Sequence, residues 1–170
     1  MVNLNTNFIE RLKKIKMVIT DVDGVLTDGG LYYTADGLVM KKFNVKDGMG
    51  SVLLRENGII CGIISTDVSP VITKRGERLK LDFTYIGIHD KKSKMLELCD
   101  EYDILPEEVA FIGDDVNDVG IISAVGFSAA PADAVDKIID MVDYICVREG
   151  GKGAFRELSD LLIKHKYEED

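Results

Sequence analysis

Short apolar runs alternate with amphipathic stretches along most of the chain. Continuous apolar runs of this length are typical of strands that are buried on both faces. They predict strands near residues 17–21, 59–64, 83–87, 109–113, 126–129 and 143–147. The stretches between them have the pattern of helices. This alternation predicts an α/β fold with a mostly parallel sheet.

Polar residues mark where several helices begin. Asp47 and Gly58 bracket one predicted helix as N-cap and C-terminal stop, and Ser69 comes directly before a proline at the first position of the next. A third helix begins after Asp90, its predicted N-cap. Its apolar face has the spacing i, i+3, i+4, i+7 and consists of Met95, Leu98, Cys99 and Tyr102. These apolar positions indicate core rather than function.

Residues 30–43 depart from this alternation. Two strand-like runs are joined there through Asp36 and Gly37, which is a good signal for a short hairpin. Only 37 residues separate Thr27 from Ser65, and 25 separate Ser65 from the next candidate site residue. Neither interval can hold a separate cap domain beside the predicted sheet elements. We therefore expect an open site in a single subunit.

The first predicted strand ends in two carboxylates. Asp21 and Asp23 are one residue apart, and Gly24 follows them. Alternate side chains of a strand share a face, so both can face a pocket at the carboxyl end, where open α/β sheets bind ligands. The alternative is an Asp-rich turn without a chemical role. An EF-hand loop is excluded, because it requires its glycine at position 6.

A second strand, near 109–113, also ends in acids. Asp114, Asp115 and Asp118 follow it, where a helix should begin. Magnesium typically binds one or two carboxylates together with phosphate oxygens and water, which two such strand ends could supply together. The alternative is that Asp114 or Asp115 only caps the helix, and that Asp118 is a first-turn acid favoured by the helix dipole.

Two positions between the acidic clusters are suited to contact a phosphoryl group. Ser65 and Thr66 follow the apolar run 59–64 and offer hydroxyl donors. Lys91 lies at the start of a predicted helix, where its charge would balance carboxylates and phosphate. The alternative for Ser65 and Thr66 is an ordinary loop before a helix. The alternative for Lys91 is a solvated side chain, which is the commoner fate of a single Lys.

The composition limits the classes of partner. The chain has 170 residues, 46% of them hydrophobic, and a net charge of −9, as expected for one globular domain without a nucleic-acid or membrane footprint. Its three cysteines are odd in number and widely spaced, so they indicate reduced core residues. The first 16 residues lack the apolar core of a signal peptide, and no apolar run approaches the roughly 20 residues of a membrane span. We expect a cytoplasmic protein.

Four segments match, in order, the motifs of the haloacid dehalogenase superfamily of phosphatases. They are the segment DVDGVLT that begins at Asp21, then Ser65, then Lys91, and the segment GDDVND that contains Asp114. The match spans nearly the whole chain. Residues 1–170 therefore resemble a single phosphatase domain of this superfamily, which implies a Rossmann-like three-layer sandwich.

Three further segments resemble a narrower family, the 3-deoxy-D-manno-octulosonate 8-phosphate phosphatases. They are residues 27–30, 42–50 and 150–157. This resemblance implies a β-hairpin flap at about residues 30–43 and no cap domain. It also implies a sugar-acid phosphate as substrate and a place in the synthesis of lipopolysaccharide precursors.

The resemblance assigns roles to the catalytic residues. Asp21 would attack phosphorus and form an aspartyl-phosphate, an established covalent strategy. Asp23 would be the general acid for the leaving sugar oxygen and then the general base for water. Ser65 would donate a hydrogen bond to a phosphoryl oxygen, and Lys91 would neutralise charge in the transition state.

The resemblance also implies Mg²⁺ as cofactor. Its ligands would be the Asp21 carboxylate, the backbone carbonyl of Asp23 and the Asp114 carboxylate. Asp115 and Asp118 would contact the metal through water, or would contact its ligands rather than the metal itself. The metal would screen the repulsion between the nucleophile and the dianionic phosphate.

The candidates for binding the sugar acid lie in the loops near these motifs. They are Thr27, Asp28, Lys46, Thr66, Asp67, Arg78, Gly151 and Arg156. The glycine-rich stretch 150–153 can cradle an anion as a nest, or it is a plain turn before the last helix. The octulosonate enzymes typically carry Gly-Arg where this chain has Thr66 and Asp67, and Arg78 could pair with that aspartate. A deaminated or N-acetylated nonulosonate 9-phosphate is therefore an alternative substrate.

The narrower family implies a homotetramer in which the hairpin mediates assembly and a neighbouring subunit covers each site. Leu31, Tyr32 and Tyr33 suit burial in such an interface, although they could equally pack on their own sheet. A non-catalytic assembly module, as in domains appended to sialic-acid cytidylyltransferases, is an alternative against which the complete set of motif residues argues. A phosphomutase would need a cap.

Overall fold

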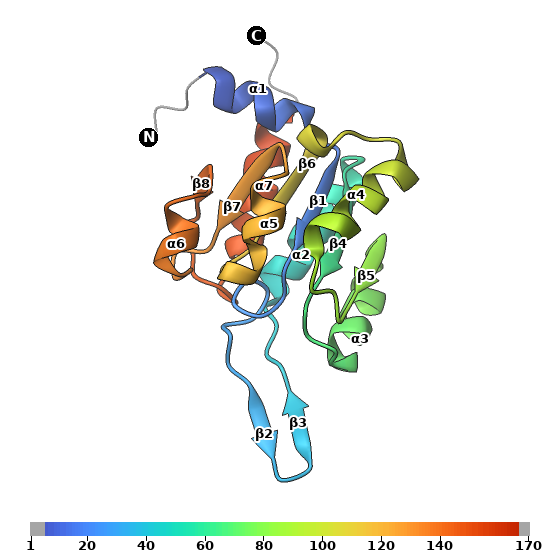
Figure 1. The fold of residues 1–170 in the computed structure, drawn as a ribbon, viewed down its shortest axis with the longest axis vertical. Coiled ribbons are helices and arrows are strands. Elements are labelled where there is room, and N and C mark those ends of the chain that lie inside the picture. Colours follow the sequence, from blue (N-terminus) through green and yellow to red (C-terminus); the bar gives the residue numbers. More distant parts are fainter. Residues whose placement is uncertain (1–5, 167–170) are drawn as a thin grey trace.

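The computed structural model describes residues 6–166, which form a central sheet with helices on both faces (Figure 1). Its six strands are all parallel and follow the order β5-β4-β1-β6-β7-β8. They are β1 (Met17–Thr20), β4 (Ile60–Ile64), β5 (Phe83–Tyr85), β6 (Val109–Ile112), β7 (Phe127–Ala130) and β8 (Tyr144–Ile145). The predicted α/β fold is confirmed, and each of the six predicted strands is present.

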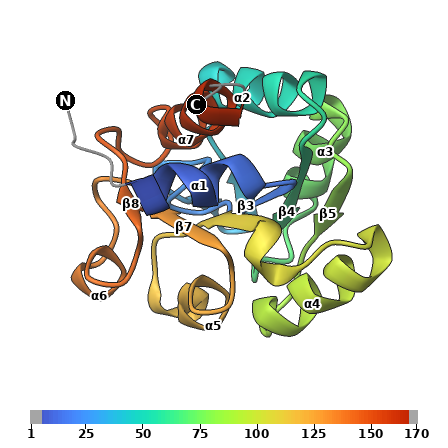
Figure 2. The same cartoon turned by 90° about the horizontal axis from the view of Figure 1, so that it is seen from above.

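The helices form one layer on each face of the sheet (Figure 2). The first layer consists of α2 (Val45–Glu56), α3 (Pro70–Leu79) and α7 (Ala154–Lys166), and α1 (Thr6–Lys14) lies across the amino ends of the strands with its Leu12 in the same core. The second consists of α4 (Lys91–Tyr102), α5 (Val119–Ile122) and α6 (Asp136–Ile139). Two 3₁₀ turns, Pro106–Glu108 and Val116–Asp118, flank β6. The molecule is thus a Rossmann-like three-layer sandwich.

Alternate residues of β1 face the two helical layers. Val18 packs in the core that contains Leu158 of α7, whereas Met17 and Ile19 pack in the core that contains Leu98 of α4. All of these side chains are buried. β1 also pairs with β4 on one side and β6 on the other. Two neighbouring strands and two helical layers therefore fix the position of its carboxyl end.

The start of α2 differs from the prediction. Its N-cap is Asn44, whose side chain accepts a hydrogen bond from the backbone N–H of Lys46. Asp47, the predicted cap, lies in the first turn and is buried. Its carboxylate accepts a hydrogen bond from the backbone N–H of Arg156 at 3.0 Å. The prediction was wrong because this contact joins segments more than 100 residues apart.

The next two helices begin as predicted. Ser69 caps α3, which has Pro70 at its first position, and Asp90 caps α4. The predicted apolar face of α4 is confirmed by its contacts in the core, where the packed residues are Met95, Leu98, Cys99 and Tyr102. All three cysteines are buried and free, as expected for reduced core residues. Within residues 6–166, no helix is long and apolar enough to span a membrane.

A separate hairpin projects from the end of the sandwich where β1 stops (Figure 1). It consists of β2 (Tyr32–Thr34) and β3 (Gly37–Met40). Because Thr34 pairs with Gly37, the connection is Ala35-Asp36, one residue earlier than predicted. Gly37 itself has φ +117°, a conformation that favours glycine.

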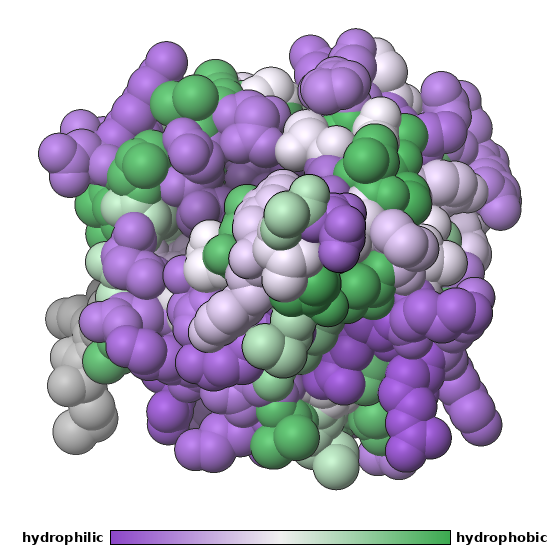
Figure 3. Space-filling view, turned by 90° about the horizontal axis from the view of Figure 1, so that it is seen from below, coloured by the Kyte–Doolittle hydropathy of each residue, from purple (hydrophilic) through white to green (hydrophobic). Residues whose placement is uncertain are grey.

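The hairpin exposes apolar side chains to solvent in the single chain. They are Leu31, Tyr32, Tyr33, Val39 and Met40. Figure 3 views this end of the molecule and shows hydrophobic residues around the centre, with hydrophilic residues toward the periphery. The alternative in which Leu31, Tyr32 and Tyr33 pack on their own sheet is not what the structure shows. A two-stranded hairpin is marginally stable on its own in water, so these side chains favour further contacts.

Candidate active site

The carboxyl end of β1 places Asp21 inside the sandwich and Asp23 nearer the surface. Asp21 is 4% exposed; its carboxylate accepts a hydrogen bond from the Val22 N–H at 2.7 Å and lies 2.8 Å from the Lys91 Nζ. Burial raises the pKa of Asp21 to about 6, although the positive charge of Lys91 acts in the opposite direction. The Asp21 carboxylate is therefore buried at the end of a strand that is fixed on both faces.

Two further acids, Asp114 and Asp118, follow the adjacent strand β6. The Asp118 carboxylate accepts a hydrogen bond from the Asp114 N–H at 3.1 Å and contacts the Lys91 Nζ at 2.6 Å. Asp114 packs against Gly24, where an added Cβ would lie 1.9 Å from the Asp114 Oδ2. Gly24 also has φ +83°. Glycine is thus required at this position for both backbone conformation and space.

These acids form a cluster suited to a divalent cation. Asp21, Asp114 and Asp118 each offer one oxygen, and the three oxygens lie within 4.8 Å of one another. Burial, followed by the charges of Asp21 and Asp118, raises the pKa of Asp114 to about 8. Three carboxylates face a single ammonium group, so a hard cation with oxygen ligands would neutralise the excess negative charge. The residues present therefore fit magnesium.

Lys91 is the lysine that the structure brings to this cluster. Its side chain is 1% exposed and lies between Asp21 and Asp118, whereas the adjacent Lys92 is exposed. Burial acts to lower the pKa of Lys91, but its two carboxylate partners raise the pKa above the ordinary value. The ammonium group therefore stays charged. Asp118 holds both this lysine and the backbone at Asp114.

A cavity of about 290 Å³ opens onto the acids. Its lining is polar and comes from the ends of β1, β4 and β6: Asp21, Asp23, Gly24, Gly29, Ser65, Thr66, Asp114, Asp115 and Asn117. Ser65 lies directly after β4 and is buried. Asp115 caps the 3₁₀ turn Val116–Asp118, as one of the weighed alternatives anticipated. Residues of three of the four motifs, far apart in the sequence, thus share one cavity, and Lys91 of the remaining motif is buried in contact with Asp21.

One residue of this region was missed by the sequence reasoning. Lys41, which directly follows β3, contacts the Asp23 carboxylate at 2.5 and 2.7 Å and the Asp67 carboxylate at 2.6 Å. The expected pairing of Asp67 with Arg78 is not formed; Arg78 is exposed on α3. A lysine at the base of a hairpin carries no local signal for such a contact.

Two other candidates lie in the loop that follows Asp23. Thr27 is fully buried, and its hydroxyl lies 3.4 Å from the Asp23 Oδ1. Asp28 pairs with the exposed Lys42 at 2.8 Å. Gly151 has φ +66° and packs on this loop, since an added Cβ would lie 2.5 Å from the Asp28 backbone nitrogen. Neither Thr27 nor Gly151 lines the acidic cavity.

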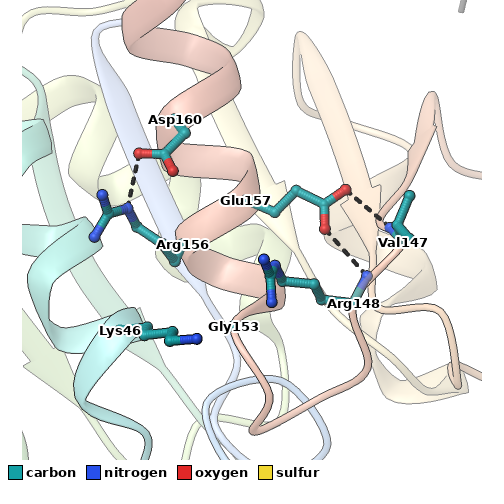
Figure 4. A pocket seen from close by; sticks show the side chains of 7 residues that line it. All are labelled: Lys46, Val147, Arg148, Gly153, Arg156, Glu157 and Asp160. Atoms are coloured by element: carbon teal, nitrogen blue, oxygen red, sulfur yellow. Dashed lines mark hydrogen bonds and ion pairs between the residues drawn. The ribbon is translucent and has the colours of Figure 1, made fainter. Parts of the chain in front are cut away.

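The remaining candidates lie elsewhere. Lys46 and Arg156 line a second, open cavity of about 870 Å³ that shares no lining residue with the acidic one (Figure 4). Arg148 also lines it, and Glu157 accepts hydrogen bonds there from the backbone N–H groups of Val147 and Arg148. The structure therefore brings these basic residues together, but not with the acidic cluster.

Comparison with known proteins identifies the class of enzyme to which this fold and this site belong. A sequence model of the haloacid dehalogenase-like hydrolases matches residues 66–157, and the chain belongs to this family. A protein of Haemophilus influenzae named 3-deoxy-D-manno-octulosonate 8-phosphate phosphatase is 39% identical over 155 residues, which cover 91% of this chain and 86% of that protein. The Escherichia coli K12 protein of the same name is 36% identical over 94% of this chain and 85% of its own length.

Solved structures extend this similarity to the fold. The cobalt-bound phosphatase of Haemophilus influenzae superposes with a TM-score of 0.89 at 39% identity, covering 92% of this chain and 91% of that one. The Moraxella catarrhalis enzyme in complex with magnesium, phosphate and 3-deoxy-D-manno-octulosonate gives 0.91 at 32% identity, with 95% and 94% covered. The resemblance inferred from the sequence is confirmed, and the chain is an enzyme of this phosphatase family.

Proposed function

We propose that the protein is a Mg²⁺-dependent phosphomonoesterase that converts 3-deoxy-D-manno-octulosonate 8-phosphate to the free sugar acid and phosphate. The observation that supports it most directly is the buried Asp21 carboxylate, held 2.8 Å from Lys91 beside two further acids. The relatives named for this reaction match more than nine-tenths of the chain.

Asp21 is the nucleophile in this proposal. One of its oxygens bonds to phosphorus while the ester P–O bond breaks, and Asp23 donates its proton to the departing sugar oxygen. In the second half, Asp23 takes a proton from water, whose oxygen bonds to phosphorus and releases Asp21 and inorganic phosphate. Burial raises the pKa of Asp23 despite its contact with Lys41, which favours the protonated acid that the first half requires.

Charge stabilisation comes from the groups around the nucleophile. Lys91 neutralises charge on Asp21 and the transferring group, and Ser65 donates a hydrogen bond to a phosphoryl oxygen. Asp21, Asp114 and the backbone carbonyl of Asp23 would hold the magnesium ion, which supplies further positive charge at the phosphate. Asp118 acts by holding Lys91, with which it makes a 2.6 Å contact. Asp115 would reach the metal through water.

Substrate contacts are proposed at the mouth of the cavity. Thr66 lines it directly, and Asp67 lies beside it in contact with Lys41. Because this aspartate replaces the arginine typical of the octulosonate enzymes, a nonulosonate 9-phosphate is the second candidate substrate. The other sugar-binding candidates can contact substrate only if it extends beyond the acidic cavity or if another subunit contributes; they are Thr27, Asp28, Lys46, Arg78, Gly151 and Arg156.

We further propose a homotetramer built through the hairpin, with a neighbouring subunit covering each site. The exposed Leu31, Tyr32 and Tyr33 on a projecting two-stranded element support this arrangement. A reducing, cytoplasmic location agrees with three buried free cysteines.

Phosphate release tests the function. Purified protein with Mg²⁺ is given octulosonate 8-phosphate, the deaminated and N-acetylated nonulosonate 9-phosphates, and hexose phosphates as controls. We expect the highest kcat/KM with the octulosonate ester. A preference for a nonulosonate ester would transfer the assignment to the second candidate. No release by folded, metal-loaded protein would contradict the enzymatic assignment and favour an assembly module.

A further inference from the structure

Lys41 joins the base of the hairpin to the active site. Lys41 follows β3 directly, and its side chain is completely buried although it carries a charge. The ammonium group contacts both oxygens of Asp23, at 2.5 and 2.7 Å, and one oxygen of Asp67 at 2.6 Å. A buried ammonium group is costly unless it is paired, so these two carboxylates fix its position.

Asp67, the second carboxylate partner of Lys41, is itself held by hydrogen bonds. The Asp67 Oδ1 accepts a hydrogen bond from the Ser69 N–H at 2.7 Å, and the Asp67 N–H donates to the Ser65 Oγ at 3.2 Å. Ser65 lines the catalytic cavity. A continuous set of contacts therefore runs from Ser65 through Asp67 and Lys41 to Asp23, from the end of β4 to the end of β1.

Asp23 has few other constraints. Its side chain is one-third exposed, and the Thr27 hydroxyl lies 3.4 Å from its Oδ1, which is long for an O–H···O bond. Without Lys41, the carboxyl group could rotate toward solvent. A general acid must lie within hydrogen-bond reach of the leaving oxygen, so loss of orientation reduces catalysis even when the group itself is intact.

We propose that Lys41 is a positioning residue that orients the Asp23 carboxyl group for proton transfer and couples this orientation to the seating of the hairpin. The inference rests on the proposed phosphatase function. It assigns no direct contact between Lys41 and the phosphoryl group. The residue acts through Asp23, and Asp67 acts through Lys41.

The test compares two substrates with different leaving groups. A sugar alkoxide needs a proton as it departs, whereas the p-nitrophenolate ion does not. We measure kcat/KM, which reports the steps through ester cleavage, for octulosonate 8-phosphate and p-nitrophenyl phosphate. Lys41→Met should lower kcat/KM for the sugar ester by about 10-fold to 100-fold, part of the contribution typical of general acid catalysis, and by less than about 3-fold for the aryl ester.

Two further variants make the result specific. Lys41→Arg keeps a cation able to bridge two carboxylates and should restore sugar-ester activity to within about 5-fold of wild type. Lys42→Met removes the adjacent lysine, which is exposed and pairs with the exposed Asp28, and should leave both activities unchanged. Melting temperature and oligomeric state are recorded for every variant.

Several outcomes would overturn the inference. Equal losses for the two esters in Lys41→Met, together with a lower melting temperature, would show a structural role only. If Lys41→Met does not fold, the comparison moves to Asp67→Asn, which weakens one of the two ion pairs that hold Lys41, and equal losses for both esters would again refute it. If wild type prefers another alkyl phosphate, the proposed substrate is wrong and the same comparison is made with that ester. If wild type cleaves no phosphate ester, both the function and this inference fail.

Discussion

Replacing Lys91 by Met should strongly destabilise the protein in the absence of metal. The Lys91 ammonium group lies 2.8 Å from Asp21 and 2.6 Å from Asp118, with a side chain that is 1% exposed. Each contact corresponds to about 6 kcal/mol of Coulomb energy at an effective dielectric constant of about 20, before the cost of burial. Removing one partner of a buried ion pair typically costs about 3–5 kcal/mol.

For a domain of this size, that loss corresponds to a decrease of roughly 6–20 °C in melting temperature. Lys92→Met is the matched control, because this neighbour is exposed and should change stability by less than about 0.5 kcal/mol. Thermal and urea unfolding are measured at pH 7.5 in chelator and in Mg²⁺. Added Mg²⁺ should stabilise Lys91→Met more than wild type, since the variant has one more uncompensated negative charge in the cluster.

Two results would refute this reasoning. Equal stability of Lys91→Met and Lys92→Met in chelator would mean that the acids are not buried around the ammonium group as described. A smaller Mg²⁺ stabilisation in Lys91→Met than in wild type would mean that removing the ammonium group does not leave extra negative charge for the ion to neutralise. In either case the electrostatic role of Lys91 in catalysis would also lose its basis.

Three further predictions concern the acids and their glycine. Asp21→Asn should abolish turnover while the melting temperature stays within a few degrees of wild type, and activity near wild type would contradict the nucleophile assignment. Asp114→Asn should require a higher Mg²⁺ concentration for half-maximal activity; an unchanged titration would exclude Asp114 as a ligand. Because burial raises the pKa of Asp114 to about 8, above its unfolded value of about 3.9, the stability linked to its proton is present below about pH 4 and is lost as pH rises toward 8. Metal-free Asp114→Asn should therefore lose less stability than wild type between pH 5 and 8, measured by urea unfolding. Gly24→Ala should lower both melting temperature and activity, since the new Cβ would lie 1.9 Å from the Asp114 Oδ2 at φ +83°; a wild-type profile would show that the loop relaxes.

The sheet and the acidic cluster could be predicted because both are encoded locally. Buried parallel strands are continuous apolar runs, and the residues that follow them meet at one edge of the sheet whatever the loops do. This is why Asp21, Ser65 and Asp114 share a cavity in the structure as the pattern indicated. Lys91 was identified by the motif match, and the structure buries this lysine and exposes its neighbour Lys92.

Contacts between distant loops could not be predicted in this way. Asp47 has the residue type and position of a helix cap, but its carboxylate instead accepts a hydrogen bond from the Arg156 N–H of the last helix. Lys41 lies in a hairpin whose alternating pattern does not reveal that its charge is buried against Asp23. Lys46 and Arg156 share a cavity, yet it is not the one that the acidic cluster lines. In each case the decisive partner is set by tertiary packing rather than by local spacing.

The pairing of Lys41 with Asp67 changes how the departure after Ser65 should be interpreted. Taken from the sequence alone, an aspartate in place of the arginine typical of the octulosonate enzymes puts negative charge at the mouth of the site. In the structure Lys41 contacts this aspartate at 2.6 Å and lies between it and Asp23, so the added charge is largely compensated within the protein. An arginine at position 67 would instead place two cations side by side next to the proposed general acid. Because Lys41 directly follows the second strand of the hairpin, we expect substrate preference to depend both on the residue at position 67 and on the position of the hairpin.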